Sequence, residues 1–283
     1  MNTLDYELAG MRLRLCSEGI LEETELWRPF RCNSTEPPMH TYELRWKQSF
    51  AHDMGALLLE TPEVCVTQSK MGVCRRYRLA QTEEFHAVAT ECGAKTVVEV
   101  LRKNTPWGQN AQQLFRVLSL PHLLLRHGCI LLHGAYLDIG GEAIVFSAPP
   151  ETGKTTQARL WMKHRGARIV NGDCVIVGMT AGRVCAYGVP TCGTSGICEN
   201  RTLPLRAVIF LSQGRENRAL LCSARQALRS LSENTYHEPD RPEDALARID
   251  LSLALIKAIP MISFACLPEQ SAVDALEALL TGL

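Results

Sequence analysis

The chain has 283 residues, of which 46% are hydrophobic, and its 30 basic and 30 acidic residues give a formal net charge of zero. A balanced charge creates no overall field that would attract nucleic acid or an anionic membrane, so neither is expected as a partner. No apolar run approaches the roughly 18 residues that span a bilayer, and no secretory signal precedes Asp5 and Glu7, which favours a soluble, cytoplasmic protein.

Short runs that alternate between polar and apolar residues dominate the first hundred positions. Alternation at period two predicts half-exposed strands, and turn-forming segments such as 34–38 separate them. We expect a small, mainly β domain over residues 1–108. Its predicted strands are Met11–Leu15, Tyr42–Trp46, Val64–Thr67, Arg75–Leu79 and Val97–Leu101.

Apolar residues at helical spacing begin at Asn110 and predict a helix that continues to Leu125 despite Pro121. The rest of the chain, grouped with this helix as residues 109–283, is predicted to be a sheet-dominated nucleotide-binding domain, so the fold class is mixed α/β. Its predicted strands are Cys129–Leu137, Ala143–Phe146, Arg168–Val170, Cys174–Gly178, Val184–Tyr187, Ala207–Leu211 and Met261–Cys266. Its predicted helices are Lys154–Lys163, Ser223–Leu231, Glu243–Ala258 and Val273–Leu280.

Residues 148–156 follow the predicted strand Ala143–Phe146 and continue into the predicted helix that starts at Lys154. Their sequence, Ala-Pro-Pro-Glu-Thr-Gly-Lys-Thr-Thr, matches the end of the phosphate-loop (Walker A) pattern G-x-x-x-x-G-K-[ST]. A helix start offers unpaired N–H groups and partial positive charge to a phosphate, and a lysine adds a full charge. The residues predicted to bind the nucleotide are Pro150, Glu151, Thr152, Gly153, Lys154, Thr155 and Thr156.

This loop departs from the pattern at one position, where Ala148 replaces the leading glycine. Pro149 and Pro150 occupy unrestricted positions of the pattern but remove two N–H donors. The alternative interpretation is an ordinary turn and helix cap, but the strand before the motif and the helix after it favour a phosphate site.

Two flanking features complete a pattern found in one known family. Leu131-Leu132-His133-Gly134 precedes the loop, and Asp173 follows the apolar strand behind it. Together with Gly-Lys-Thr-Thr, they resemble the HPr kinase/phosphorylase family, which shares its ATP-binding core with phosphoenolpyruvate carboxykinases and has relatives that modify peptides. The resemblance covers about 129–211, and it implies a P-loop domain of this type.

The resemblance also implies roles for individual residues. Lys154 contacts the β- and γ-phosphates of ATP, and Thr155 and Asp173 hold Mg²⁺. Asp173 also accepts the proton of an attacking hydroxyl, with His133 beside it. The first aspartate of the family's Asp-Asp pair is Gly172 here. The alternatives are a simple Asn-Gly-Asp turn for Asp173 and a hydrogen-bonded core histidine for His133.

A glycine- and hydroxyl-rich segment, residues 188–201, follows. Its free N–H groups suit a lid over an anion, to which Thr194 and Ser195 would contribute, and Arg201 could reach a transferring phosphoryl group. A solvated connector with a surface arginine is the alternative. Cys192 and Cys198 lie within this segment, on either side of Gly193 and Gly196, but no matching Cys/His pair exists elsewhere, so zinc is not expected. Most of the twelve cysteines are predicted to be buried, reduced thiols.

The leading functional hypothesis is an ATP- and Mg²⁺-dependent kinase that phosphorylates a serine or threonine of a peptide or small protein, recruited by the N-terminal domain. The alternatives are a nucleotide-binding regulatory or scaffold protein that has lost catalysis, suggested by Ala148 and Gly172, and a carboxykinase-like enzyme acting on a small metabolite. Members of the resembled family form oligomers, and the apolar helix Val273–Leu280 offers an interface for a homo-oligomer.

Overall fold

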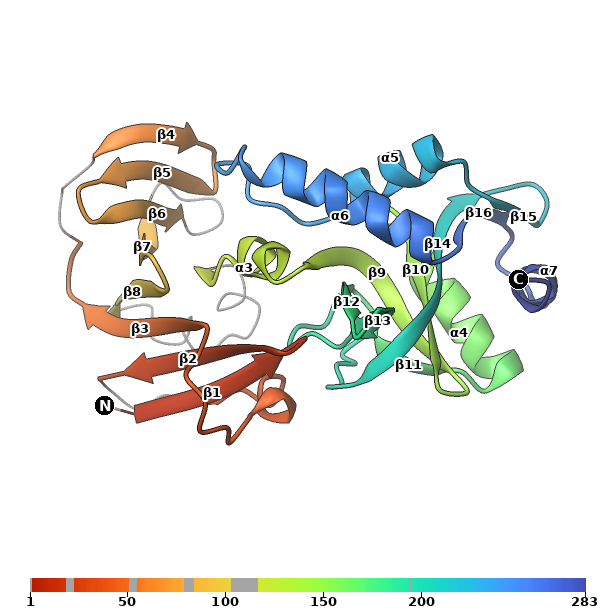
Figure 1. The fold of residues 1–283 in the computed structure, drawn as a ribbon, viewed down its shortest axis with the longest axis horizontal. Helices are drawn as coiled ribbons and strands as arrows, with labels where there is room; N and C mark the ends of the chain where they lie inside the picture. The colour runs from red at the N-terminus through yellow and green to blue at the C-terminus, as the bar shows by residue number, and fades with distance from the viewer. Residues whose placement is uncertain (1, 19–22, 51–54, 79–83, 103–116, 194) are drawn as a thin grey trace. The chain divides into compact units, whose positions relative to one another are not determined.

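The computed structural model describes residues 2–18, 23–50, 55–78, 84–102, 117–193 and 195–283. Its internal contacts group into two compact units, Met1–Leu120 and Pro121–Leu283. The boundary predicted at 108/109 lies outside the described residues. The molecule is a mixed α/β protein in which two large sheets dominate, one in each unit (Figure 1).

The N-terminal unit contains an eight-stranded sheet in the order β1-β2-β3-β8-β7-β6-β5-β4. One face of β2, β3 and β8 is fully buried, since alternate residues such as Leu13, Tyr42, Leu44 and Val98 are 0–1% exposed. All five predicted strands are present, and β1, β4 and β7 are additional. The strands are β1 (Asn2–Leu8), β2 (Met11–Ser17), β3 (His40–Lys47), β4 (Ala56–Glu60), β5 (Val64–Ser69), β6 (Gly72–Arg78), β7 (Phe85–Cys92) and β8 (Lys95–Leu101), with a short 3-10 helix η1 (Arg28–Phe30).

The C-terminal unit is built around two long strands, β9 (Cys129–Ile139) and β14 (Thr202–Gln213). The first half of β9 pairs with β12 (Cys174–Thr180), and its second half pairs with β10 (Glu142–Ser147) and β11 (Arg168–Asn171). The start of β14 pairs with β13 (Arg183–Tyr187), and the rest of β14 pairs in parallel with β10 and β16 (Met261–Cys266). The strand β15 (Arg218–Leu221) pairs with the other side of β16.

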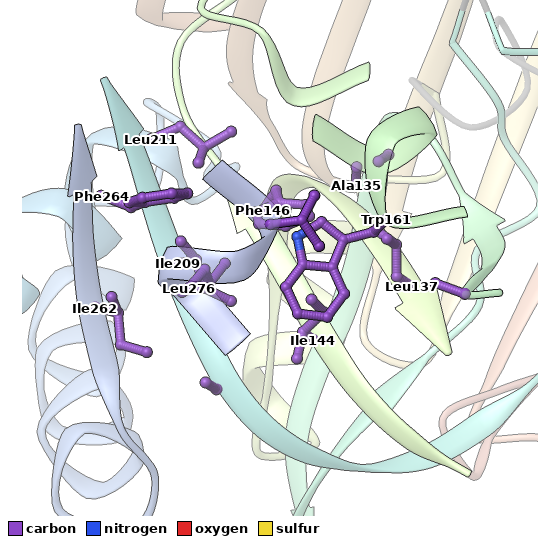
Figure 2. Close-up of a cluster of buried hydrophobic side chains, with 14 of the residues drawn as sticks. Ala135, Leu137, Ile144, Phe146, Trp161, Ile209, Leu211, Ile262, Phe264 and Leu276 are labelled. Atoms are coloured by element: carbon purple, nitrogen blue, oxygen red, sulfur yellow. The ribbon is translucent and has the colours of Figure 1, made fainter. Parts of the chain in front are cut away.

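Helices cover both faces of the β10-β14-β16 region. On one face, α4 (Lys154–Arg165) and α7 (Gln270–Thr281) bury Trp161 and Leu276 against Phe146, Ile209 and Phe264 (Figure 2). On the other face, α5 (Ala224–Asn234) and α6 (Asp244–Ala258) contribute to a second core. Because β10 and α4 belong to the same core, the loop that joins them is held at the end of β10.

The predicted strands and helices of this unit are all present, with one correction. The helix predicted over Asn110–Leu125 does not continue through the described part of that range. Ser119 has a φ of 46°, in the left-handed region, which breaks helical geometry before α3 (Leu120–Arg126) begins. Pro121 is therefore near a helix start, where its missing N–H is tolerated.

In the part of the chain that the structure describes, no helix is both long and apolar enough to cross a membrane.

Candidate functional site

The loop between β10 and α4, residues 148–153, is called the candidate phosphate loop here. Gly153 is the N-cap of α4 and has a φ of 113°, which an L-residue with a side chain rarely adopts. No side chain caps this helix, so the N–H groups of its first turn lack a side-chain acceptor. The chain thus places open N–H donors at the start of α4, where an anion can bind.

Lys154 is the first residue of α4 and is only 8% exposed. Its Nζ donates hydrogen bonds to the carbonyl oxygens of Ala148 (2.8 Å) and Pro149 (3.0 Å), so the ammonium group is bound to the backbone of the loop. Burial lowers the pKa of Lys154, and the negative charge of Asp173 opposes this shift. The lysine is therefore held by two neutral acceptors that a phosphate could replace.

The residues of the candidate phosphate loop that precede Thr152 are unusual for such a loop, and the structure shows what each of them does. Ala148 is 2% exposed and belongs to the same hydrophobic core as Phe146 and Trp161, so its methyl group contributes to stability. Pro149 and Pro150 are exposed and accept hydrogen bonds from Thr152 Oγ1 through their carbonyl oxygens. Glu151 has a φ of 62°, a left-handed conformation that strains a residue with a side chain.

His133 and Asp173 lie together at the other side of the site. They come from β9 and from the turn between β11 and β12, and Nδ1 of His133 is 3.8 Å from Oδ1 of Asp173. Burial, followed by the charge of Lys154, lowers the pKa of His133, and Asp173 opposes the shift. Lys154, His133 and Asp173, three residues selected from the sequence, are therefore close enough to interact electrostatically.

Asn171 fixes the turn that carries Asp173. Its side chain is fully buried, and its Oδ1 accepts hydrogen bonds from the backbone N–H groups of Asp173 (2.9 Å) and Cys174 (3.1 Å). Its Nδ2 donates to the carbonyl oxygens of Thr191 (2.6 Å) and Val189 (3.2 Å). Asn171 thus ties the turn of Asp173 to the segment 188–201, a role that the sequence analysis missed although asparagine commonly forms such turns.

The segment 188–201 packs closely against this turn. A Cβ atom at Gly172 would lie 2.6 Å from Cβ of Ser195, and one at Gly193 would lie 2.9 Å from Oδ1 of Asp173. Real Cβ atoms do not approach that closely, so both glycines are required for this packing. Ser195 therefore occupies the space that a side chain at position 172 would need. Thr194, the other predicted hydroxyl, lies outside the described residues.

Arg201 is placed elsewhere. Its Nη2 forms an ion pair with Oδ2 of the buried Asp138 at 2.5 Å. Asp138 pairs with Ala143 at the start of β10, whereas the candidate phosphate loop follows the end of that strand. The structure therefore does not bring Arg201 together with Lys154 and Asp173, and it gives this arginine a structural partner.

Tyr236 joins the site from the segment after α5. Its Oη is 3.2 Å from Nδ1 of His133, and the two rings meet edge to face with centroids 6.0 Å apart. Nε2 of His133 is buried and has no hydrogen-bond partner among the residues that the structure describes. Tyr236 was missed from the sequence because nothing local marks a tyrosine 103 residues away as a neighbour of His133.

Thr155 and Thr156 occupy the first turn of α4, and Thr155 is half-buried. Within the described residues, no group of three or more His, Cys, Asp or Glu side chains is arranged to hold a metal ion. The oxygen atoms of Thr155 and Asp173 are suitable ligands for Mg²⁺, a cation that normally keeps water and phosphate ligands and needs few protein groups. The donor set fits Mg²⁺ that arrives with a nucleotide.

Comparisons with known proteins give little further guidance. No family model matches the chain, and no curated protein matches it. Among solved structures, the chain is similar to the Hpr(Ser) kinase/phosphatase from Coxiella burnetii, with a TM-score of 0.29 and 12% sequence identity over 54% of this chain and 93% of that chain. A similarity this weak leaves the function to be argued from the residues of this chain.

Proposed function

We propose that this protein binds a nucleoside triphosphate with Mg²⁺ at the candidate phosphate loop and transfers the terminal phosphoryl group to a serine or threonine hydroxyl of a peptide or small protein. The observation that supports it is the grouping of Lys154, His133 and Asp173 around an uncapped helix start. A full positive charge, open N–H donors and a carboxylate are the groups that phosphoryl transfer requires.

Each residue has a defined task in this proposal. Lys154 and the N–H groups at the start of α4 hold the phosphates, which replace the carbonyl oxygens of Ala148 and Pro149 as partners of the ammonium group. Thr155 and Asp173 provide oxygen ligands for Mg²⁺, which neutralises phosphate charge when bound.

Asp173 also orients the acceptor hydroxyl. The hydroxyl oxygen forms a bond to the γ-phosphorus, the bond from that phosphorus to the bridging oxygen breaks, and the nucleoside diphosphate leaves. The hydroxyl proton passes to the carboxylate of Asp173. His133 lies 3.8 Å away, and its lowered pKa favours a neutral ring beside this carboxylate at physiological pH.

We place recruitment of the acceptor in the N-terminal unit. Its strand β4 is the end strand of the sheet and exposes Leu57 (63%) and Leu58 (51%). An extended peptide can add to such an edge through backbone hydrogen bonds.

The direct test of the proposed function is formation of ADP from Mg²⁺-ATP, with serine-containing peptides or water as the acceptor. Wild type is compared with Lys154→Ala and Asp173→Asn. The proposal predicts ADP formation in wild type that both substitutions abolish. The proposal would be contradicted if, with every acceptor tried, Lys154→Ala formed ADP at the same rate as wild type.

A nucleotide-binding module without transfer is the second candidate. It is favoured by the absence of a carboxylate at Gly172, where Ser195 fills the space, and by the two prolines in the loop. Tight binding of ATP or ADP without hydrolysis or transfer would favour this candidate over the kinase.

A further inference from the structure

A cavity of about 370 Å³ lies against the candidate phosphate loop. One wall comes from the loop and α4, through Gly153, Thr156 and Gln157, and the other comes from the ends of β14 and β16, through Gln213, Cys266 and Pro268. Its volume is within the range of roughly 300–1,000 Å³ that is typical of small-molecule sites. The sequence analysis assigned no function to the residues of the second wall.

Gln157 joins the two walls of this cavity. The residue is 2% exposed, and its Nε2 donates hydrogen bonds to the carbonyl oxygen of Leu267 at 2.9 Å and to Sγ of Cys266 at 3.3 Å. Both acceptors belong to the second wall, so these bonds hold the start of α4 to the end of β16. The cavity between the two walls is therefore preformed, as small-molecule sites usually are.

Gln157 and Lys154 are three residues apart on α4, so they are neighbours on one side of the helix and separated by about 4.5 Å along its axis. A ligand whose phosphates bind at Lys154 can therefore extend its remaining part into the cavity. In a nucleotide that part is the nucleoside, whose base and ribose carry N–H and O–H donors. Pro268 and Leu267 provide apolar surface for the base.

We infer that this cavity is the nucleoside-binding site, with the two walls that Gln157 joins enclosing the base and ribose. The inference rests on the proposed function, because it places the organic part of the same nucleotide. Such a site would make the protein bind a nucleotide more tightly than inorganic polyphosphate, which has phosphates but no nucleoside.

The test compares the dissociation constants of Mg²⁺-ATP and Mg²⁺-tripolyphosphate by titration calorimetry. Gln213→Trp fills the cavity from an exposed position at the end of β14. We expect it to weaken ATP binding at least tenfold and to leave tripolyphosphate binding unchanged. Ser212→Trp is the matched control, since Ser212 is also exposed but its side chain leaves the opposite face of the strand.

A second readout uses the thiol of Cys266, which lines the cavity. Its alkylation by N-ethylmaleimide is followed by mass spectrometry, with Cys222, another half-buried thiol of the same unit, as the reference. ATP should slow the alkylation of Cys266 at least threefold relative to Cys222, and tripolyphosphate should not. Equal affinities for ATP and tripolyphosphate, or an ATP affinity that Gln213→Trp leaves intact, would overturn the inference alone. Binding of neither ligand would overturn the proposed function and the inference together.

Discussion

Tyr236 Oη lies 3.2 Å from Nδ1 of His133, the same nitrogen that faces Asp173 at 3.8 Å. Two oxygen-bearing side chains, from segments distant in the sequence, therefore converge on one ring nitrogen. This contact restricts the orientation of the imidazole beside the carboxylate that the proposed reaction uses.

Tyr236→Phe tests the importance of that contact. The substitution removes one hydrogen bond but keeps the ring that packs against His133, so nucleotide binding should be unchanged. Because a hydrogen bond of this kind contributes about 0.5–1.5 kcal/mol, we expect phosphoryl transfer to slow by roughly two- to tenfold. Steady-state kinetics with saturating ATP measure the effect. A rate equal to that of wild type would show that Tyr236 does not position His133.

The lowered pKa of His133 predicts a pH dependence of stability. Its ordinary value is 6.5, and burial together with the charge of Lys154 lowers it in the folded state. As the pH falls below that ordinary value, the unfolded chain binds a proton here before the folded chain does, so the free energy of unfolding decreases. His133→Gln should make this decrease shallower, as measured by urea unfolding between about pH 5 and pH 7. An unchanged slope would argue against a buried, neutral histidine.

Glu151 is strained, with a φ of 62°, and its carboxylate carries negative charge in the candidate phosphate loop. Glu151→Gly should relieve the strain and stabilise the protein by about 1 kcal/mol, and it should also tighten nucleotide binding because it removes charge repulsion. Ala181→Gly is the matched control, since Ala181 has a φ of 50° in the turn between β12 and β13. The control should be stabilised without a change in nucleotide affinity. Equal effects of both substitutions on affinity would contradict the role given to the loop.

Gly172 is required by the close packing of Ser195. Gly172→Asp would restore the pair of aspartates seen in the resembled family, but its Cβ would lie 2.6 Å from Cβ of Ser195. We expect a loss of about 1–3 kcal/mol in the free energy of unfolding, as overpacking typically gives. Adding Ser195→Gly should recover part of that loss in urea unfolding. The absence of any recovery would place the clash elsewhere.

Local features of the sequence predicted the elements that carry the site. The strand, loop and helix around Lys154 follow from an apolar run, a glycine and helical periodicity, all of which act within a few residues. Five strands of the N-terminal unit were predicted from their polar alternation, whereas β7 was missed because residues on both of its faces are buried, so its pattern does not alternate. The strand β1 was missed although Leu4, Tyr6 and Leu8 alternate with polar residues.

The partners of the site could not be predicted, because they depend on tertiary packing. Tyr236 contacts His133, and Asn171 contacts Thr191, across long separations in the sequence. Arg201 pairs with Asp138 although its spacing suggested a phosphate contact. The carboxylate of Asp138 is buried on β9 and needs a cation, which only the sheet pairing reveals.

The most direct test of the central claim is the thermal-unfolding shift caused by Mg²⁺-ATP or Mg²⁺-ADP in wild type, Lys154→Ala and Lys163→Ala. Lys163 lies on the same helix but is exposed, so its substitution controls for the loss of a lysine. A ligand that binds only the folded state raises the unfolding temperature. We predict a shift in wild type and Lys163→Ala that is lost in Lys154→Ala. The absence of a shift in wild type, or an equal shift in Lys154→Ala, would contradict a phosphate site at Lys154.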